Sequence, residues 1–328
     1  MTPRRRSLVN CLVLVIAAVP VGCRVGPSVS GSFDRSFDVT GHTRLEVSEA
    51  SGEVEVIGGS SDGKVHVHGL VRASGMGFND PKNRLAEALA NPGVEQRGDT
   101  IRIGKHFSIV RNVSITYHIE VPKDTEANLT TASASMTVRD IRGPVTATSA
   151  SGAIQLDHVE RDVRMTSMSG DVHASDIGDD VRASSASGEI TIRNAKGDVR
   201  ANSLSGRVQV LGLGGRVEAN SASGSIEVQG ATADAKAHSA SGEVNIAGDP
   251  GANGYWDLKT ASGKVQLNVP LAANFHLSAE SASGEIRADI PIVIEEQNKH
   301  SLRAHVGDGG GRVEVRTVSG EIHVSKPA

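Results

Sequence analysis

A tetrapeptide of the form Ser-x-Ser-Gly returns through the second half of the chain at a constant step of 18 residues. Its glycine stands at positions 152, 170, 188, 206, 224 and 242. Looser copies end at Gly263, Gly284 and Gly320, at steps of 21, 21 and 36 residues. A regular period of this length is typical of proteins built from stacked structural repeats. This feature restricts the possible folds of the 328-residue chain more than any other.

Apolar residues alternate on both sides of each glycine. A β-branched residue follows the glycine by two positions in every copy, and another apolar residue follows it by four. Pairs such as Val181 and Ala183 lie seven and five positions before the next glycine. A spacing of two indicates β-strands, whereas glycine with small polar residues indicates a corner. One repeat therefore predicts two short strands and two turns.

Such strand pairs cannot bury an apolar face alone, so the repeats must stack. We predict an all-β fold: a single-chain parallel β-solenoid with about 18 residues per coil, right-handed, and one short helix in the N-terminal part. The chain has five Phe, two Tyr and one Trp, none of them between positions 131 and 248. Small inward Ala and Ser opposite Val and Ile suit this thin core, whereas a large α/β enzyme core would use more aromatic area.

Charged residues offer a test of the stacking. Two positions in each repeat carry opposite charges, and one repeat reverses both signs. In an in-register parallel stack, this reversal places Arg216 between Asp198 and Asp234, and Glu218 between Arg200 and Lys236. The two columns are Asp162, Asp180, Asp198, Arg216, Asp234 and Arg164, Arg182, Arg200, Glu218, Lys236. A left-handed hexapeptide helix, which would suggest an acyltransferase, is rejected because its apolar residues recur every six positions.

The first 22 residues predict an export signal, with Arg4 to Arg6 followed by a short apolar run. Val21-Gly22-Cys23 resembles the end of a bacterial lipobox, although Pro20 departs from its usual aliphatic residue. We expect Cys23 to be lipidated, anchoring the protein in the outer membrane; cleavage that leaves a free thiol is the alternative. Removal of three Arg changes the net charge from −4 to −7, which disfavours nucleic acid as a partner.

Four segments are expected along the chain. Residues 1–22 form the signal and 23–31 a polar tether. Residues 32–130 form a β region that caps the solenoid, with a helix near 81–90 that Asp80 caps and Pro81 begins. Residues 131–328 form the solenoid repeats. We interpret Ser133-Ala-Ser-Met136 as an early copy without its glycine, and Ala50-Ser51-Gly52 as an isolated copy.

The repeats resemble the bacterial DUF4097 family of adhesin-like proteins. Copies such as Ser185-Ala-Ser-Gly-Glu-Ile190 match its hallmark, residues 115–122 look like its entry segment and residues 309–320 like its closing coil. The resemblance implies a β-helical envelope protein. It carries over no catalytic residue, ligand or cofactor.

Candidate sites for chemistry are few. His66 and His68 share one strand face and could supply half a zinc site with His42 or His106, but a solvated face is preferred. Calcium at 176–180 or 307–311 is disfavoured against ordinary turns because tandem nonapeptides are absent. Glu295-Glu296 is interpreted as a charged turn.

The serine columns are the most repeated polar feature. No His recurs at a fixed distance from these serines, so nucleophilic catalysis is not expected. We expect their hydroxyls to form hydrogen bonds within the turns. A flat outward array of serines could instead bind glycan or ice. The alternation leaves open which way each column points. The columns are Ser149, Ser167, Ser185, Ser203, Ser221 and Ser239, together with Ser151 through Ser241.

These observations predict an exported, non-enzymatic protein of the cell envelope that presents a repetitive polar face, with a membrane anchor and no cofactor, metal or catalytic residue. The partner would be a glycan or an envelope protein. One alternative is an envelope-stress scaffold that binds another envelope protein. A polysaccharide-active β-helix enzyme is less favoured, because 18-residue coils leave no room for long catalytic loops.

Overall fold

The computed structural model describes residues 28–75, 80–104 and 113–327. The export signal and Cys23 lie outside these residues. The chain divides into two compact units, Met1–Gly152 and Ala153–Ala328, whereas the sequence pattern placed its boundary at 130/131. Among the described residues, no helix has the length and apolar character needed to cross a membrane.

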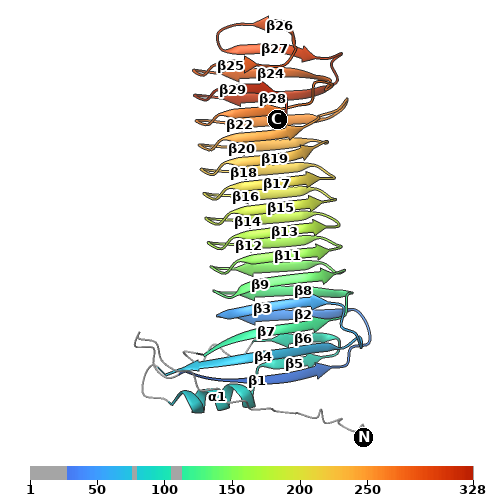
Figure 1. The fold of residues 1–328 in the computed structure, drawn as a ribbon, viewed down its shortest axis with the longest axis vertical. Helices are drawn as coiled ribbons and strands as arrows, with labels where there is room; N and C mark the ends of the chain where they lie inside the picture. The colour runs from blue at the N-terminus through green and yellow to red at the C-terminus, as the bar shows by residue number, and fades with distance from the viewer. Residues whose placement is uncertain (1–27, 76–79, 105–112, 328) are drawn as a thin grey trace. The chain divides into compact units, whose positions relative to one another are not determined.

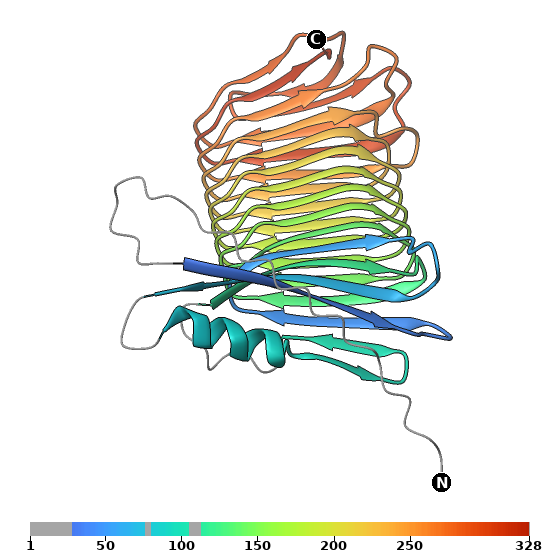
Figure 2. The ribbon, with the colours of Figure 1, turned by 60° about the horizontal axis from the view of Figure 1, so that its bottom comes forward.

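The second unit is a parallel β-solenoid in which each 18-residue coil contributes one strand to each of two sheets (Figures 1 and 2). We call these sheets A and B. In spatial order, sheet A contains β11 (Ile154–Val159), β13 (Val172–Ile177), β15 (Ile190–Ala195), β17 (Val208–Leu213), β19 (Ile226–Ala231), β21 (Val244–Gly248), β23 (Val265–Asn268), β29 (Ile322–Ser325) and β25 (Ile286–Ala288). Sheet B contains β12 (Val163–Ser167), β14 (Val181–Ser185), β16 (Val199–Ser203), β18 (Val217–Ser221), β20 (Ala235–Ser239), β22 (Tyr255–Thr260), β28 (Gly311–Thr317), β24 (Phe275–Ser281), β27 (Ser301–Val306) and β26 (Val293–Gln297).

The register confirms the predicted stacking. Val181 of β14 pairs with Val199 of β16, and Val199 pairs with Val217 of β18, so equivalent residues of successive coils lie side by side. Inward Val, Ile and Ala side chains between the two sheets are almost fully buried. The fold class is therefore the expected all-β solenoid; its right-handed sense stays a prediction.

The last coil in the sequence is not the last coil in the stack. Strands β28 and β29 lie between the coil of β22 and β23 and the coil of β24 and β25. The expectation that residues 309–320 close the solenoid is therefore wrong. The free edge of β24 is instead taken by the antiparallel hairpin of β27 and β26, after which the chain returns through the turn at 307–310. Steps of 21 and 36 residues do not reveal this reversal, because coils in either order would have the same spacing in the sequence.

The first unit combines parallel coils with an antiparallel end. One sheet has the order β1 (Ser28–Phe37), β4 (Val65–Ser74), β7 (Val113–Val121), β3 (Gly52–Gly58) and β9 (Ser135–Ile141). The other has the order β10 (Val145–Ser149), β8 (Thr125–Thr131), β2 (Thr43–Glu49), β6 (Thr100–Ile103) and β5 (Val94–Arg97). The pairs β1–β4, β4–β7 and β5–β6 are antiparallel, so this end differs from the repeated coils.

The helix α1 (Pro81–Ala90) forms where it was expected. The Asp80 carboxylate accepts a hydrogen bond from the Lys82 backbone N–H at 2.9 Å, and Pro81 occupies the first helical turn. Helix α1 lies against β1 and β4 (Figure 2). Its Leu85 and Leu89 are buried there, and Leu89 fills the space that Gly31 leaves.

The copy of the repeat expected at residues 133–136 lies two residues earlier in the structure. Thr131 pairs with Ser149, and a Cβ on Gly152 would overlap the carbonyl oxygen of Ala134. The copy is therefore residues 131–134, with Ala134 in place of glycine, and Met136 is an ordinary core residue rather than a lost glycine. Residues 49–52 stack in register on this copy, because Glu49 pairs with Thr131.

Candidate functional site

The two serines of each repeat point in opposite directions. Ser167, Ser185 and Ser203 are buried at the ends of their strands, whereas Ser169 and Ser187 are exposed. The residue between them is exposed too, with 64% of Met168 and 61% of Leu204 accessible. Two consecutive outward residues form the corner, which shifts the strand alternation by one position.

The buried serines are structural. Ser185 Oγ accepts a hydrogen bond from the Gly188 backbone N–H at 2.9 Å, and Ser239 Oγ accepts one from Gly242 at 2.8 Å. Ser239 Oγ also donates to the Gly224 carbonyl of the preceding coil at 3.2 Å. These bonds satisfy the backbone of each corner and tie neighbouring coils together. Their hydroxyls lie inside the coil, so this column cannot form the outward binding array considered above.

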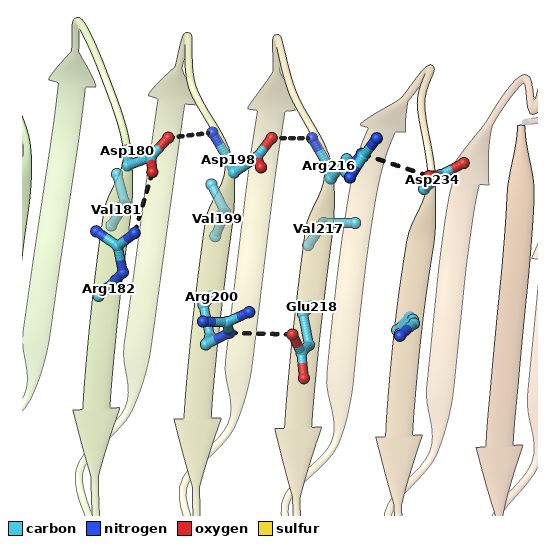
Figure 3. Close-up of a pocket in the computed structure, with 11 residues that line it drawn as sticks. Asp180, Val181, Arg182, Asp198, Val199, Arg200, Arg216, Val217, Glu218 and Asp234 are labelled. Carbon is cyan, nitrogen blue, oxygen red and sulfur yellow. Dashed lines mark hydrogen bonds and ion pairs between the residues drawn. The ribbon is translucent and has the colours of Figure 1, made fainter.

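A groove of about 270 Å³ runs over the outer face of sheet B, across β14, β16, β18 and β20 (Figure 3). It follows the two charge columns, and the predicted reversal is confirmed within it. Arg216 Nε lies 3.4 Å from Asp234, and its backbone N–H donates to Asp198 at 2.9 Å. Arg200 Nε lies 3.0 Å from Glu218. The residues lining the groove are Asp180, Val181, Arg182, Asp198, Val199, Arg200, Arg216, Val217, Glu218, Asp234 and Lys236.

Carboxylates of the acidic column also accept hydrogen bonds from backbone N–H groups of the next coil. Asp180 Oδ1 accepts from the Asp198 N–H at 2.9 Å, and Asp234 Oδ1 accepts from the Tyr255 N–H at 3.0 Å (Figure 3 shows the first of these bonds). Each carboxylate therefore binds the next coil of the stack. The neighbouring charges act on the side chains as well: the hydrogen bond from Arg200, with further help from Lys236, lowers the pKa of the Glu218 carboxyl despite its partial burial.

Three arginines occupy one outward column on consecutive strands. Arg164 pairs in register with Arg182, and Arg182 with Arg200, so their backbones are about 4.8 Å apart. Arg182 contacts Asp180 at 3.2 Å and Arg200 contacts Glu218, whereas Arg164 has no ion pair in the described part of the chain. Like charges in adjacent positions repel each other. A polar partner that binds these guanidinium groups would relieve this repulsion, so we expect binding to be strongest at this column.

Of the histidines considered for zinc, His106 lies outside the described residues, and His66 and His68 bind different partners. His66 Nε2 lies 2.8 Å from Asp62, and its Nδ1 lies 2.9 Å from Ser36 Oγ. His68 instead lies 2.7 Å from Asp34. Both histidines share the outer face of β4 as expected.

The other candidate positions have turn or strand roles. Asp176 has a left-handed backbone with φ of 54° and accepts from Asn194 at 2.9 Å, and the Asp308 N–H donates to Asn274 at 2.9 Å. Glu295 and Glu296 lie in β26 rather than in a turn, because β26 forms a hairpin with β27. No three His, Cys, Asp or Glu side chains among the residues with described positions gather in a geometry that could hold a metal ion.

Two buried acids were missed by the sequence analysis. Asp257, on the outer face of β22, is 6% exposed and binds Lys259 at 2.7 Å and His238 at 3.0 Å. Glu49 is 7% exposed and has an oxygen, Oε2, without a hydrogen bond. Two features of the sequence could have pointed to these acids. Asp257 lies in a longer, 21-residue coil, and Glu49 stands three residues before Gly52, where other copies have serine or threonine.

Comparisons with known proteins find one matching family model and several similar solved structures. The family model Toastrack DUF4097 matches residues 42–325. A solved structure described as a putative lipid binding protein from Parabacteroides distasonis is 20% identical, covers 71% of this chain and 93% of its own, and has a TM-score of 0.42. One described as a putative adhesin from Bacteroides fragilis is 13% identical, covers 89% and 96%, and has a TM-score of 0.39. Comparison with curated proteins gives no match.

Proposed function

The chain belongs to the Toastrack DUF4097 family, and from this premise we propose that it is an exported, non-enzymatic binding protein of the bacterial cell envelope. Its solenoid presents the outer face of sheet B to a surface polymer or a partner cell. The observation that carries the proposal is the in-register stacking of outward side chains, which repeats one polar surface at each coil. Several weak contacts to a repetitive partner then add up to strong attachment.

The arginine column supplies the test of this face. A triple variant of Arg164, Arg182 and Arg200 to Ser should bind isolated envelope polymer about tenfold more weakly, since three exposed polar contacts are lost. The control variant changes Arg193, Lys196 and Arg207 to Ser, which removes the same charge from exposed positions outside the column. Equal loss in both variants would show that only net charge matters and would argue against a specific face.

A role as an envelope scaffold is the second candidate, in line with a repeated face that could hold another protein. A glycan array and a pull-down from envelope extracts separate the two. Binding to glycans supports adhesion, whereas recovery of one envelope protein with no glycan signal supports the scaffold.

An enzyme that degrades polysaccharides is disfavoured by the short corners. The buried Ser Oγ atoms are engaged with corner backbone groups, and the outer face of sheet B carries paired charges rather than a deep cleft. Depolymerisation of any member of a broad acidic polysaccharide panel by the purified protein would contradict the non-enzymatic proposal.

Attachment to the outer membrane through Cys23 completes the proposal, supported by the signal-like sequence before it. Palmitate labelling should disappear in Cys23→Ala and persist in Cys11→Ala, because Cys11 lies within the segment that is removed. Labelling that survives in Cys23→Ala would overturn the anchor.

A further inference from the structure

A second cleft, of about 570 Å³, opens on the outer face of sheet B near the C-terminal end of the second unit. Lys259, Arg316 and Glu280 form its floor from β22, β28 and β24, which are consecutive in the sheet. The turn between β26 and β27 stands beside them and contributes Asn298 and His300. The remaining lining residues are Thr260, Ser281, Ala282, Ser301, Thr317 and Val318.

The turn is held rigidly against β24. The Ser281 N–H donates to the His300 carbonyl at 2.9 Å, and His300 Nδ1 lies 3.2 Å from the Ser281 carbonyl. Asn298 Oδ1 accepts from the N–H groups of His300 at 2.9 Å and Ser301 at 2.8 Å. The cleft therefore has a fixed wall before any ligand arrives.

These bonds leave donors and acceptors for a ligand. Because a carbonyl can only accept, His300 Nδ1 carries the proton, so neutral His300 offers Nε2 as an acceptor. The Asn298 amide nitrogen and Glu280 Oε1 have no hydrogen bond within the described chain. Lys259 has one carboxylate partner and three N–H donors.

Both cations of the cleft already have carboxylate partners. Lys259 Nζ lies 2.7 Å from Asp257, and Arg316 lies 3.5 Å from Glu280 and 3.3 Å from Glu314. An anionic ligand would compete with these carboxylates, whereas hydroxyl groups can use the remaining donors and acceptors. Val318, which is 59% exposed, adds an apolar patch for the C–H face of a sugar ring.

We propose that this cleft binds a hexose unit of a neutral glycan. The proposal rests on the binding function above and assigns it a discrete site and ligand class. The cleft continues the outward column that runs through Asn202, Asn220 and His238 to Lys259, so a glycan lying along the stack would reach it. No Phe, Tyr or Trp is among the described residues that line the cleft, so each sugar should bind weakly.

Saturation-transfer NMR with the intact protein tests the site, using mannohexaose, cellohexaose and hexa-N-acetylchitohexaose as neutral probes and hexagalacturonate as the acidic probe. Asn298→Asp keeps the oxygen that holds the turn but removes the amide donors, and Val318→Ser removes the apolar patch. Each should weaken binding of a neutral probe by about three- to tenfold. Asn245→Asp is the matched control: it makes the same chemical change on the outer face of sheet A, where Asn245 Oδ1 accepts a hydrogen bond from Asn268 at 2.9 Å, and it should bind as wild type.

Binding of at least one neutral probe with these variant effects supports the proposal. Binding of no neutral probe, binding of hexagalacturonate alone, or wild-type affinity in both cleft variants overturns it. The proposed binding function is tested separately. It is contradicted if the wild-type protein binds neither envelope polymer nor envelope protein. If only the cleft proposal is wrong, the arginine variant should still bind envelope polymer more weakly than wild type.

Discussion

Glu49 is a carboxylate in a position that serine or threonine occupies in other coils. It pairs with Thr131 and accepts hydrogen bonds from Ala50 N–H at 3.0 Å and Ser51 N–H at 3.5 Å. Burial outweighs these bonds and raises its pKa to about 7. Burial, and then the nearby charge of Glu49, also raises the pKa of the Tyr117 hydroxyl.

This raised pKa makes stability fall as pH rises. In the unfolded chain the carboxyl ionises near its ordinary pKa of 4.5, whereas the folded chain retains the proton up to about 7. The free energy of unfolding should therefore lose up to about 3 kcal/mol from this group between these pH values, and no more above pH 7. Glu49→Gln removes the ionisation and should be more stable than wild type at pH 8, with little difference at pH 4.5.

Denaturant unfolding at pH 4.5, 6, 7 and 8 measures this effect. Glu53→Gln is the control, because Glu53 is exposed on β3, the next strand along the chain. A stability difference between Glu49→Gln and wild type that is the same at every pH would contradict the assignment.

At the scale of the strand, the reversed charges of β18 match its neighbours. Arg216, just before β18, contacts Asp198 and Asp234 of the adjacent coils. Glu218 of β18 lies between Arg200 of β16 and Lys236 of β20. The double variant Arg216→Asp and Glu218→Arg restores the signs found in other coils but places like charges side by side. We expect it to lower the free energy of unfolding by about 1–2 kcal/mol, with less loss at high salt.

An exchange of two opposite charges outside the two columns provides the control. Exchanging Glu285 and Arg287, which form an ion pair at the edge strand β25, keeps the net charge and places no like charges side by side on β25 and β29. Unfolding in 0.05 M and 1 M salt separates the effects, and a loss in the β18 variant that salt does not reduce would contradict charge pairing as its cause.

The sequence could predict strands wherever glycine marks the corner. The strands around Gly188 and Gly206 have the expected register because each glycine accommodates a close carbonyl from the preceding coil. Ala134 removed that marker, so the early copy was placed two residues late. The left-handed residues at the other corner, Asp176 and Asn194 among them, were missed. Asp, Asn or Gly nevertheless stands six positions after each of the glycines 170, 188, 206, 224 and 242.

Of the candidate sites, the charge columns could be predicted because identical spacing becomes a line of neighbours in an in-register stack. The C-terminal cleft could not, because it joins residues from coils whose spatial order differs from their sequence order. Arg316 lies beside both Lys259 and Glu280 only through the insertion of β28.

At the scale of the whole chain, β28 and β29 lie between two other coils of the second unit rather than at the end of its stack. A chain ending at residue 310 lacks β28 and β29, leaving β22 and β24 without their shared partner strand. We expect protease-sensitive residues 255–310 in the truncated protein and a protected solenoid before them. A chain ending at 325, which keeps both strands, is the control, and equal protection of the two chains would contradict the observed order.

Everything proposed for the binding face depends on 18-residue coils lying in register. Ser184 and Asn202 pair on adjacent strands and their side chains point outward, so cysteines there should form a disulfide on mild oxidation when Cys11 and Cys23 are replaced by Ser. Mass spectrometry should detect this crosslink rapidly for Ser184→Cys with Asn202→Cys, and not for Ser184→Cys with His238→Cys, three coils apart. Failure of the first pair to crosslink, or equally rapid crosslinking within monomers of the second, would contradict the stacked solenoid.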